Sequence, residues 1–382
     1  MTPDNAHIAN SMALYGVRVL DLSRVLAGPL CAMMLGDMGA DVIKIERPGL
    51  GDETRGWGPP FDERGESAYF LSTNRNKKSV VADLASNSGR ELVFGLCRTA
   101  DIVVENFRRG ALARLGLDPV RLRDDNPRLV WLTISGFGEE SERPGYDFVV
   151  QAERGWMAIS GEPDGPPVKS GVALVDVITG KDAVAAVLGA LVARARTGMG
   201  AHVHVSLAGS ATAALVNVAQ NVLVSGHDAR RWGNAHPNLV PYQLFEAADR
   251  AIVLAVGSDA QWRSAVHVLG LEELAKDARL ATNAGRLLHR DLVVRAVGDR
   301  MRTRTAAAWI AALDGEGVPC GVVRGVAEAL REQGDASPRT GAAPSVPGSV
   351  RHPPPRLDEH GDEIRQRGWG AFRPDPHTAL AE

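Results

Sequence analysis

Short apolar runs alternate with helical patterns over the first 140 residues of the chain. The run VRVLDL at 17–22 is rich in β-branched residues, and an apolar helical pattern follows from Ala27 to Met38, with Pro29 in its first turn. The run DVIKI at 41–45 completes one βαβ unit. Because these runs are apolar on both faces, they predict parallel strands buried between helices.

The same alternation continues further along the chain. A strand at 79–84 precedes a helix at 89–99, and strands follow at 101–105 (DIVVE) and 129–135 (LVWLTIS). Strands that alternate with helices indicate a parallel sheet covered on both faces. The pattern therefore predicts an α/β fold with a Rossmann-like sheet.

The pattern beyond residue 180 is mostly helical. We expect a strand at 202–206, a buried uncharged helix within 205–226, a strand at 251–256 and a helix at 260–269. The segment 335–355 is rich in Pro, Gly, Ala and Ser, which predicts an exposed connector before a short helical end.

These elements predict three parts of the chain. Residues 1–226 form a large Rossmann-like domain, and residues 227–330 form a smaller α/β domain. Residues 331–382 are a connector and a C-terminal segment that returns to the large domain, so that both chain ends contribute to it.

Composition narrows the class of protein. The 382 residues are 45% hydrophobic and 23% charged, as in ordinary globular proteins, and the net charge of −3 argues against a nucleic-acid-binding surface. The longest apolar run, 183–193, is too short to span a bilayer, and no signal peptide is visible. Cys31, Cys97 and Cys320 are far apart, which favours a reducing compartment. We therefore expect a cytoplasmic protein without membrane or nucleic-acid partners.

Several common catalytic signatures are missing from the sequence. There is no GxGxxG, P-loop, HExxH or GxSxG motif, and no Cys with a nearby His. His202 and His204 share one face of a predicted strand, but a metal site needs more ligands than this pair. We interpret them as solvated strand residues and expect no metal.

Polar residues do follow several predicted strands. They occur in ERP at 46–48, NRNKKS at 74–79, ENF at 105–107, SGFG at 135–138 and PGYD at 144–147. In open α/β sheets, ligands bind outside the carboxyl ends of the strands. A single polar residue at such a position more often belongs to a turn or caps a helix. The prediction of a ligand site therefore rests on the whole set.

The run GVALVDVITG at 171–180 is the most unusual stretch. It resembles an apolar strand that contains one carboxylate, Asp176. A lone carboxylate in such a run is costly unless it is paired or used. Two interpretations are equally open: a structural Asp that caps a helix starting near Thr179, or a catalytic group.

Eight motifs in order resemble the family III CoA-transferases, also called the CaiB/BaiF type. They are GVRVLDLSRVLAGP, GADVIKIERPGLGDETRGW, NRNKKS, ENFRRGALARLGL, SGFG, PGYDFVVQA, SGEPDGPPVKSGVALVDVITG and AHPNLVPYQLF. The resemblance covers residues 15–325, with PPPRLDEHGDEI as a fainter match near the C-terminus. It implies an interlocked homodimer, acyl-CoA and small carboxylic acids as substrates, and no permanently bound cofactor.

The resemblance also implies roles for individual residues. Asp176 would be the nucleophile that forms a mixed anhydride and then an aspartyl-CoA thioester. The residues implied in CoA binding are Val25 and Ala27 along the pantetheine, Asn106, Phe107 and Ala111 along the path, and Arg47 and Arg114 at the adenosine-phosphate end. Those implied near the acceptor are Leu26, Trp57, Tyr69 and Tyr146. For Trp57 and Tyr69 the alternative is ordinary core packing.

Departures from the family pattern bear on the substrate. Oxalate- and formate-using members carry Gln at the position of Leu26 and a glycine run that is absent from GNAHPNLVPY at 233–242. The motifs are closest to the branch that transfers CoA from succinyl-CoA to dicarboxylates such as glutarate.

Two other functions remain as alternatives. An α-methylacyl-CoA racemase would need His at the position of Tyr146, because a tyrosine hydroxyl is a poor base at neutral pH. A segment after Val323 that is shorter than in the family leaves a non-catalytic acyl-CoA-binding protein as the other alternative.

Overall fold

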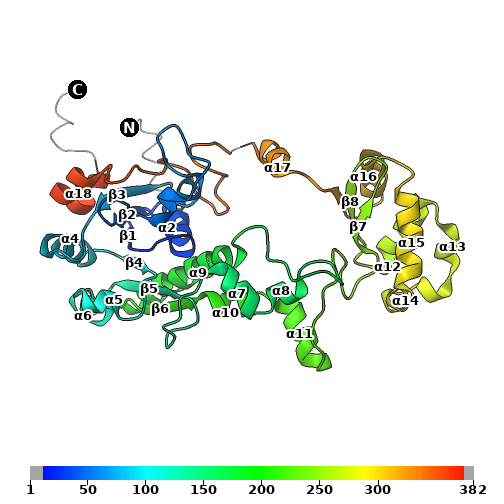
Figure 1. Ribbon diagram of the computed structural model, residues 1–382, viewed down its shortest axis with the longest axis horizontal. Coiled ribbons are helices and arrows are strands. Elements are labelled where there is room, and N and C mark those ends of the chain that lie inside the picture. Colours follow the sequence, from blue (N-terminus) through cyan, green and yellow to red (C-terminus); the bar gives the residue numbers. More distant parts are fainter. Residues whose placement is uncertain (1–11, 335, 374–382) are drawn as a thin grey trace. The chain divides into compact units, whose positions relative to one another are not determined.

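The computed structural model describes residues 12–334 and 336–373 (Figure 1). The chain divides into two compact units, which we describe separately. Unit 1 contains the described parts of 1–156, 169–226 and 334–382, and unit 2 contains 157–168 and 227–333. The three domains predicted from the sequence, with boundaries at residues 226 and 330, remain a prediction.

Unit 1 is built on a six-stranded parallel sheet, which confirms the predicted Rossmann-like α/β fold. Its strand order is β3-β2-β1-β4-β5-β6, so the order reverses between β1 and β4. The strands are β1 (Arg18–Asp21), β2 (Asp41–Glu46), β3 (Lys77–Val81), β4 (Ile102–Glu105), β5 (Val130–Ser135) and β6 (His202–Ser206). The sheet therefore has its switch point, where open α/β sheets bind ligands, beside the carboxyl ends of β1 and β4.

The central strands are apolar because both of their faces are covered. Val19 of β1 belongs to one core cluster together with residues of helices α2, α9 and α10. Leu20, the next residue, packs on the other side with residues of α4 and α18. A continuous apolar run is the expected pattern for such a strand.

The helices of the first 226 residues are α2 (Ala27–Asp37), α3 (Ala68–Leu71), α4 (Asn87–Cys97), α5 (Ala111–Arg114), α6 (Pro119–Asp125), α7 (Asp147–Glu153), α8 (Trp156–Ile159), α9 (Leu174–Thr197), α10 (Leu207–Ala213), α11 (Val216–Ser225) and the 3₁₀ turn η1 (Glu53–Gly56). Of these, α2 and α4 lie within two residues of the predicted ranges 27–38 and 89–99. Strand β3 begins two residues earlier than predicted, because the side chain of Lys77 is buried inside the sheet.

Unit 2 contains a three-stranded antiparallel sheet of order β7-β8-β9 with helices packed on it. Trp262, Val293 and Trp309 join residues of the strands in its core. Its elements are β7 (Tyr242–Glu246), β8 (Ala251–Ala255), α12 (Asp259–Leu269), α13 (Glu272–Lys276), η2 (Ala278–Leu280), α14 (Asn283–Leu288), α15 (Arg290–Met301), α16 (Ala306–Gly315), β9 (Cys320–Val322) and α17 (Val326–Gln333).

Residues 171–180 do not form the predicted strand. Helix α9 begins at Leu174, and its Gly180 lies against α2, where a Cβ would come within 2.8 Å of the Ala27 carbonyl oxygen. This packing overrides the β preference of the Val- and Ile-rich run.

The single buried helix expected within 205–226 is also wrong. Two helices, α10 and α11, meet there at an angle of 69°. Helix α11 has no buried residue in unit 1, and its Val216, Leu223 and Val224 are exposed. Within residues 12–334 and 336–373, no single helix has the length and apolarity to cross a membrane, and the bent pair α10–α11 meets this criterion only by combined length and composition.

The segment after residue 335, predicted as an exposed connector, has few buried residues and is hydrogen-bonded to unit 1. The guanidinium of Arg75 donates to the Ala342 carbonyl, and Asn76 donates to the Ser349 carbonyl at 2.9 Å. The predicted C-terminal helix is α18 (Gly361–Arg367), followed by η3 (Gly368–Phe372).

Candidate active site

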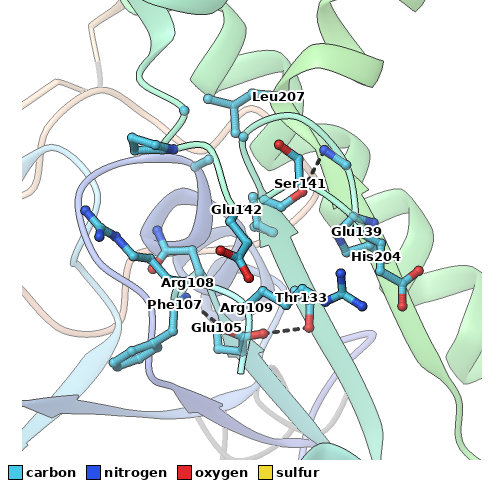
Figure 2. Close-up of a pocket in the computed structure, with 18 of the residues that line it drawn as sticks. Glu105, Phe107, Arg108, Arg109, Thr133, Glu139, Ser141, Glu142, His204 and Leu207 are labelled. Carbon is cyan, nitrogen blue, oxygen red and sulfur yellow. Dashed lines mark hydrogen bonds between the residues drawn. The ribbon is translucent and has the colours of Figure 1, made fainter. Parts of the chain in front are cut away.

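The carboxyl ends of β1 and β4 open onto a cavity of about 470 Å³ in unit 1 (Figure 2). The residues predicted from the sequence that line it are Val25, Leu26, Ala27, Asn106, Phe107, Tyr146 and Asp176. The predicted residues that do not line it are Arg47, Trp57, Tyr69, Ala111 and Arg114. The switch point of the sheet therefore brings the turn after β1, the end of β4 and the start of α9 together.

The turn at residues 23–27, which we call the cavity turn, has an unusual backbone. Val25 has a φ of 73°, a left-handed conformation that β-branched residues rarely adopt. Asn106 holds the neighbouring Arg24 on both sides: its Oδ1 accepts from the Arg24 N–H at 2.9 Å and its Nδ2 donates to the Arg24 carbonyl at 2.7 Å. Gly28 makes room for the turn, since a Cβ there would lie 2.3 Å from the Cβ of Ser23. Asn106 thus shapes the cavity wall.

Asp176 lies in the first turn of α9 and is partly buried. The residue that caps this helix is Asp147, whose Oδ1 accepts from the Val175 N–H at 2.7 Å and the Asp176 N–H at 3.3 Å. Burial, helped by the negative charge of Asp147, raises the pKa of Asp176 to about 7. The capping role considered for Asp176 therefore belongs to Asp147, and Asp176 presents a carboxyl group that titrates near neutrality.

Two glycines place Asp147 and Tyr146 beside the cavity. The SGFG and PGYD segments cross at Gly136 and Gly145, where a Cβ on Gly145 would lie 2.2 Å from the Cα of Gly136. Only glycine permits this approach. Asp147 of the PGYD motif begins α7 but caps α9, so its place at the start of a helix gives no signal for this role.

Trp57 and Tyr69 form an edge-to-face pair with ring centroids 5.1 Å apart. Trp57 is 42% exposed, so the pair is not ordinary core packing. Burial, together with the charges of Asp176, Asp147 and Asp52, raises the pKa of Tyr69 to about 12. The Tyr69 hydroxyl therefore keeps its proton near the carboxylates of this site.

The basic residues at the cavity differ from those predicted. Arg24, Arg108, Arg109 and Arg143 line it. The Arg24 guanidinium lies 5.4 Å from the centre of the Phe107 ring, a cation–π distance. The signal for two of these residues was the pair RR directly after the ENF motif at the end of β4.

Arg47 and Arg114 lie outside the cavity. Arg47 is exposed, and its Nε donates to the Gly51 carbonyl at 3.0 Å. Arg114 is exposed at the end of α5, and Ala111 begins the same helix between two residues, Gly110 and Leu112, that do line the cavity.

A second carboxyl group borders the cavity at the end of β4 (Figure 2). Glu105 accepts a hydrogen bond from the Thr133 hydroxyl at 2.6 Å, and that hydroxyl lies 2.9 Å from Nε2 of His202. Burial raises the pKa of Glu105 and lowers that of His202 and His204. The part of the chain that the structure describes holds no group of three metal-ligating side chains. These two histidines therefore belong to the cavity wall.

The site thus places the Asp176 carboxyl group at a cavity lined by both arginines and glutamates. The sequence profile of CoA-transferase family III matches residues 14–341. This chain belongs to that family. As a family III CoA-transferase it is an enzyme whose substrates are CoA thioesters.

Curated relatives of this CoA-transferase have related names. The succinate–glutarate CoA-transferase of Agrobacterium fabrum is 44% identical over 82% of this chain and 81% of that protein. The succinyl-CoA:glutarate CoA-transferase of Mus musculus is 39% identical over 91% of this chain and 84% of that protein. Among solved structures, a CaiB/BaiF family protein from Brucella suis is 40% identical, with a TM-score of 0.82 over 93% of this chain and 99% of that chain.

Proposed function

We propose that this enzyme transfers CoA from succinyl-CoA to a dicarboxylate acceptor such as glutarate, with Asp176 as the nucleophile. The observation that carries the proposal is the position of the Asp176 carboxyl group, which lines the same cavity as four arginines and forms no ion pair with them. The names of the relatives support the donor and the acceptor class.

The reaction on Asp176 proceeds by exchange between carboxylates and thioesters. The Asp176 carboxylate attacks the thioester carbonyl of the donor, which forms a mixed anhydride and expels the CoA thiolate. The thiolate then attacks the aspartyl carbonyl, which releases succinate and leaves an aspartyl-CoA thioester. The acceptor carboxylate repeats the two steps in reverse, and Asp176 is regenerated as a carboxylate.

An aspartate suits this exchange better than a serine would. The anhydride and the thioester remain activated, whereas a serine ester would be too stable to pass its acyl group on. Water must be kept away from the anhydride, and the buried Val175 beside Asp176 contributes to that exclusion.

CoA binding is proposed along the cavity turn. Val25, Leu26 and Ala27 present backbone to the pantetheine, and Phe107 borders the path. The arginines that line the cavity, with Arg47 and Arg114 beyond it, are the cations proposed for the phosphates of CoA, because guanidinium groups bind phosphate through paired donors.

The acceptor is proposed to lie on the side of Leu26, Trp57, Tyr69 and Tyr146. Leu26 lines the cavity with an apolar side chain, which favours the methylene chain of a glutarate over a compact acid. A fixed donor, succinyl-CoA, assayed with oxalate, succinate, glutarate and octanoate tests this assignment. We expect kcat/KM to be highest for the four- to six-carbon dicarboxylates. Oxalate or octanoate leading the series would refute the acceptor class.

The same reaction mixture distinguishes the other functions considered. Deuterium exchange at the α-carbon of an acyl-CoA without transfer would indicate a racemase, and acyl-CoA binding without turnover would indicate a non-catalytic protein. Tyr146 lines the cavity where a racemase would need a histidine base, which favours transfer.

A cytoplasmic homodimer is proposed as the working form of the enzyme. Val216, Leu223 and Val224 of α11 are 69%, 76% and 78% exposed, and an apolar surface of this kind favours burial against a second copy. Light scattering should give twice the mass of one chain, and Leu223→Glu should lower it. A monomeric wild-type protein would refute this part of the proposal.

A further inference from the structure

The cavity turn is attached to two buried side chains from neighbouring elements. Lys44, on β2, donates from Nζ to the Ser23 carbonyl at 2.9 Å. Asp52, in the loop after β2, accepts from the Val25 N–H through Oδ1 at 3.4 Å. The residues before and after Arg24 are therefore each hydrogen-bonded, through their backbone, to a buried charged side chain.

Lys44 and Asp52 also form an ion pair, with Nζ and Oδ2 3.0 Å apart and both side chains fully buried. A second fully buried pair lies beside it, in which the Lys77 ammonium contacts Asp21 at 2.9 Å. Oδ1 of Asp21 in turn accepts from the Ser23 N–H at 3.0 Å. Both pairs thus end on the backbone of the cavity turn.

Buried ion pairs of this kind are weak devices for stability. The cost of removing two charges from water often exceeds their attraction, and apolar side chains of similar size are frequently as stable. Apolar side chains cannot, however, form hydrogen bonds with a backbone carbonyl or N–H. The two ion pairs here form hydrogen bonds with the backbone of Ser23 and Val25 in the cavity turn.

The backbone needs such bonds at Val25. A β-branched residue with a φ of 73° is strained, and such residues persist only when the surrounding structure holds them. Asn106 holds Arg24, whereas Asp52 bonds to Val25 itself and Lys44 to Ser23. We therefore expect loss of the bonds to Asp52 and Lys44 to let Val25 relax toward ordinary backbone angles. Val25, Leu26 and Ala27 would then no longer line the cavity as they do.

Asp52 connects the turn to a second part of the site. It caps η1 by accepting from the Thr54 N–H at 3.1 Å, and its own N–H donates to Glu46 at 2.9 Å. The residue after η1 is Trp57, which contacts Tyr69. One carboxylate therefore fixes the cavity turn and the start of the segment that carries the aromatic pair.

We propose that Asp52 and Lys44 are positioning residues, which hold the cavity turn in the shape that admits acyl-CoA and act on the reaction only through that turn. The effect on kinetics rests on the proposed function, because it assumes that acyl-CoA lies against the turn. The effect on the turn itself does not.

Cleavage by trypsin tests the turn directly. The bond after Arg24 lies in the turn, and the Arg24 side chain is 40% exposed, so cleavage there reports opening of the turn. Asp52→Asn keeps the size of the side chain but loses the charge that faces Lys44. We expect cleavage after Arg24 to accelerate at least about ten-fold.

A matched control comes from unit 2. Arg286 is fully buried there and pairs with Asp259 at 2.8 Å. Arg286→Met should destabilise unit 2 but leave the rate of cleavage after Arg24 unchanged. Unchanged cleavage in Asp52→Asn, or the same acceleration in both variants, would overturn the proposal.

Kinetics then test the link to acyl-CoA. In Asp52→Asn, we expect the KM for acyl-CoA to rise at least about ten-fold, and by more than the KM for the acceptor, which Asp52 affects only through Leu26 and the segment after η1. Lys44→Met should raise the KM for acyl-CoA more than the KM for the acceptor in the same way. The double variant should have a KM for acyl-CoA no higher than that of the more impaired single variant, because both residues act through one turn.

The outcomes separate the two proposals. Faster cleavage with an unchanged KM for acyl-CoA would overturn the positioning role. A wild-type protein without transferase activity would overturn the proposed function. The trypsin experiment would still test whether Asp52 holds the turn, because it does not depend on activity.

Discussion

The pKa values of two buried carboxyl groups, on opposite sides of the cavity turn and the cavity, are shifted in opposite directions. Behind the cavity turn, Asp21 is fully buried, yet the charges of Lys77 and Lys44 outweigh burial and lower its pKa. On the other wall, burial and the charge of Asp147 both raise the pKa of Asp176 to about 7. Across residues 12–334 and 336–373, no basic side chain forms an ion pair with Asp176. The neighbouring charge therefore decides which carboxylate supports the fold and which is available for chemistry.

The difference follows from what each carboxylate must do. During the proposed turnover Asp176 becomes an uncharged anhydride and then an uncharged thioester. A buried lysine beside it would lose its partner at each of these steps, and an unpaired buried charge is costly. Asp21 keeps its charge throughout, so a buried lysine partner can remain with it.

The largest effect is expected from Asp176→Ala. Without the nucleophile, CoA transfer should fall at least about 10⁴-fold, because neither covalent intermediate can form. The affinity for CoA should stay nearly constant, since the contacts proposed for CoA lie elsewhere in the cavity. Initial rates and equilibrium binding measure the two quantities. Substantial residual turnover would refute the assignment of Asp176.

The next largest effect is expected at the phosphate end. Arg47→Ala should raise the KM for acyl-CoA about 10- to 100-fold with little change in kcat, because a contact equal in ground and transition states affects KM alone. Arg98→Ala is the control, since Arg98 is exposed at the end of α4, before β4 begins. An unchanged KM in Arg47→Ala would make Arg47 a surface charge only.

A smaller effect is expected from Asp147→Asn. The amide oxygen can still cap α9, but the negative charge that raises the pKa of Asp176 is gone. The acid limb of the acylation rate, which reports ionisation of Asp176, should therefore move to lower pH by about 0.5–1 unit. A limb that stays near pH 7 would show that burial alone sets the pKa.

The smallest effect concerns stability. The pKa of Asp176 is higher in the folded chain than its ordinary value of 3.8, so ionising it above pH 7 costs folding free energy. Asp176→Asn should therefore raise Tm at pH 8 by about 2–4 °C or more, and the gain should shrink as the pH falls toward 4. A lower Tm at pH 8 would contradict the account.

Much of the fold could be predicted from periodicity. Strands β1 and β2, which are buried on both faces, lie within one residue of their predicted ends. The edge strand β6 has its predicted ends too, although none of its residues is buried. Lys77 could not be placed in this way, because a lysine after NRN indicates a turn. Its burial in β3 is explained by Asp21, 56 residues away, together with the Pro29 carbonyl and Asn74, all of which accept from its ammonium group. The start of α9 was missed for a similar reason, since its packing on α2 is not visible in the run 171–180.

The candidate site was predicted in outline. Motif order pointed to Asp176 and to the cavity turn, which the structure brings to one cavity. The role of Asn106 as a clamp on Arg24, and that of Asp147 as the cap of α9, depend on contacts between distant segments. No spacing in the sequence records those contacts, because they arise only when the strand ends meet.

The most direct test of the central claim is to trap the intermediate on Asp176. Trypsin releases this residue in the peptide from Ser170 to Lys181, SGVALVDVITGK, in which Asp176 is the only side-chain carboxyl group. Enzyme incubated with succinyl-CoA without acceptor, then treated with hydroxylamine and digested, should yield this peptide with the mass of a hydroxamate. An unmodified peptide, from an enzyme preparation that transfers CoA when acceptor is added, would contradict the account. A hydroxamate found elsewhere in the chain would contradict it too.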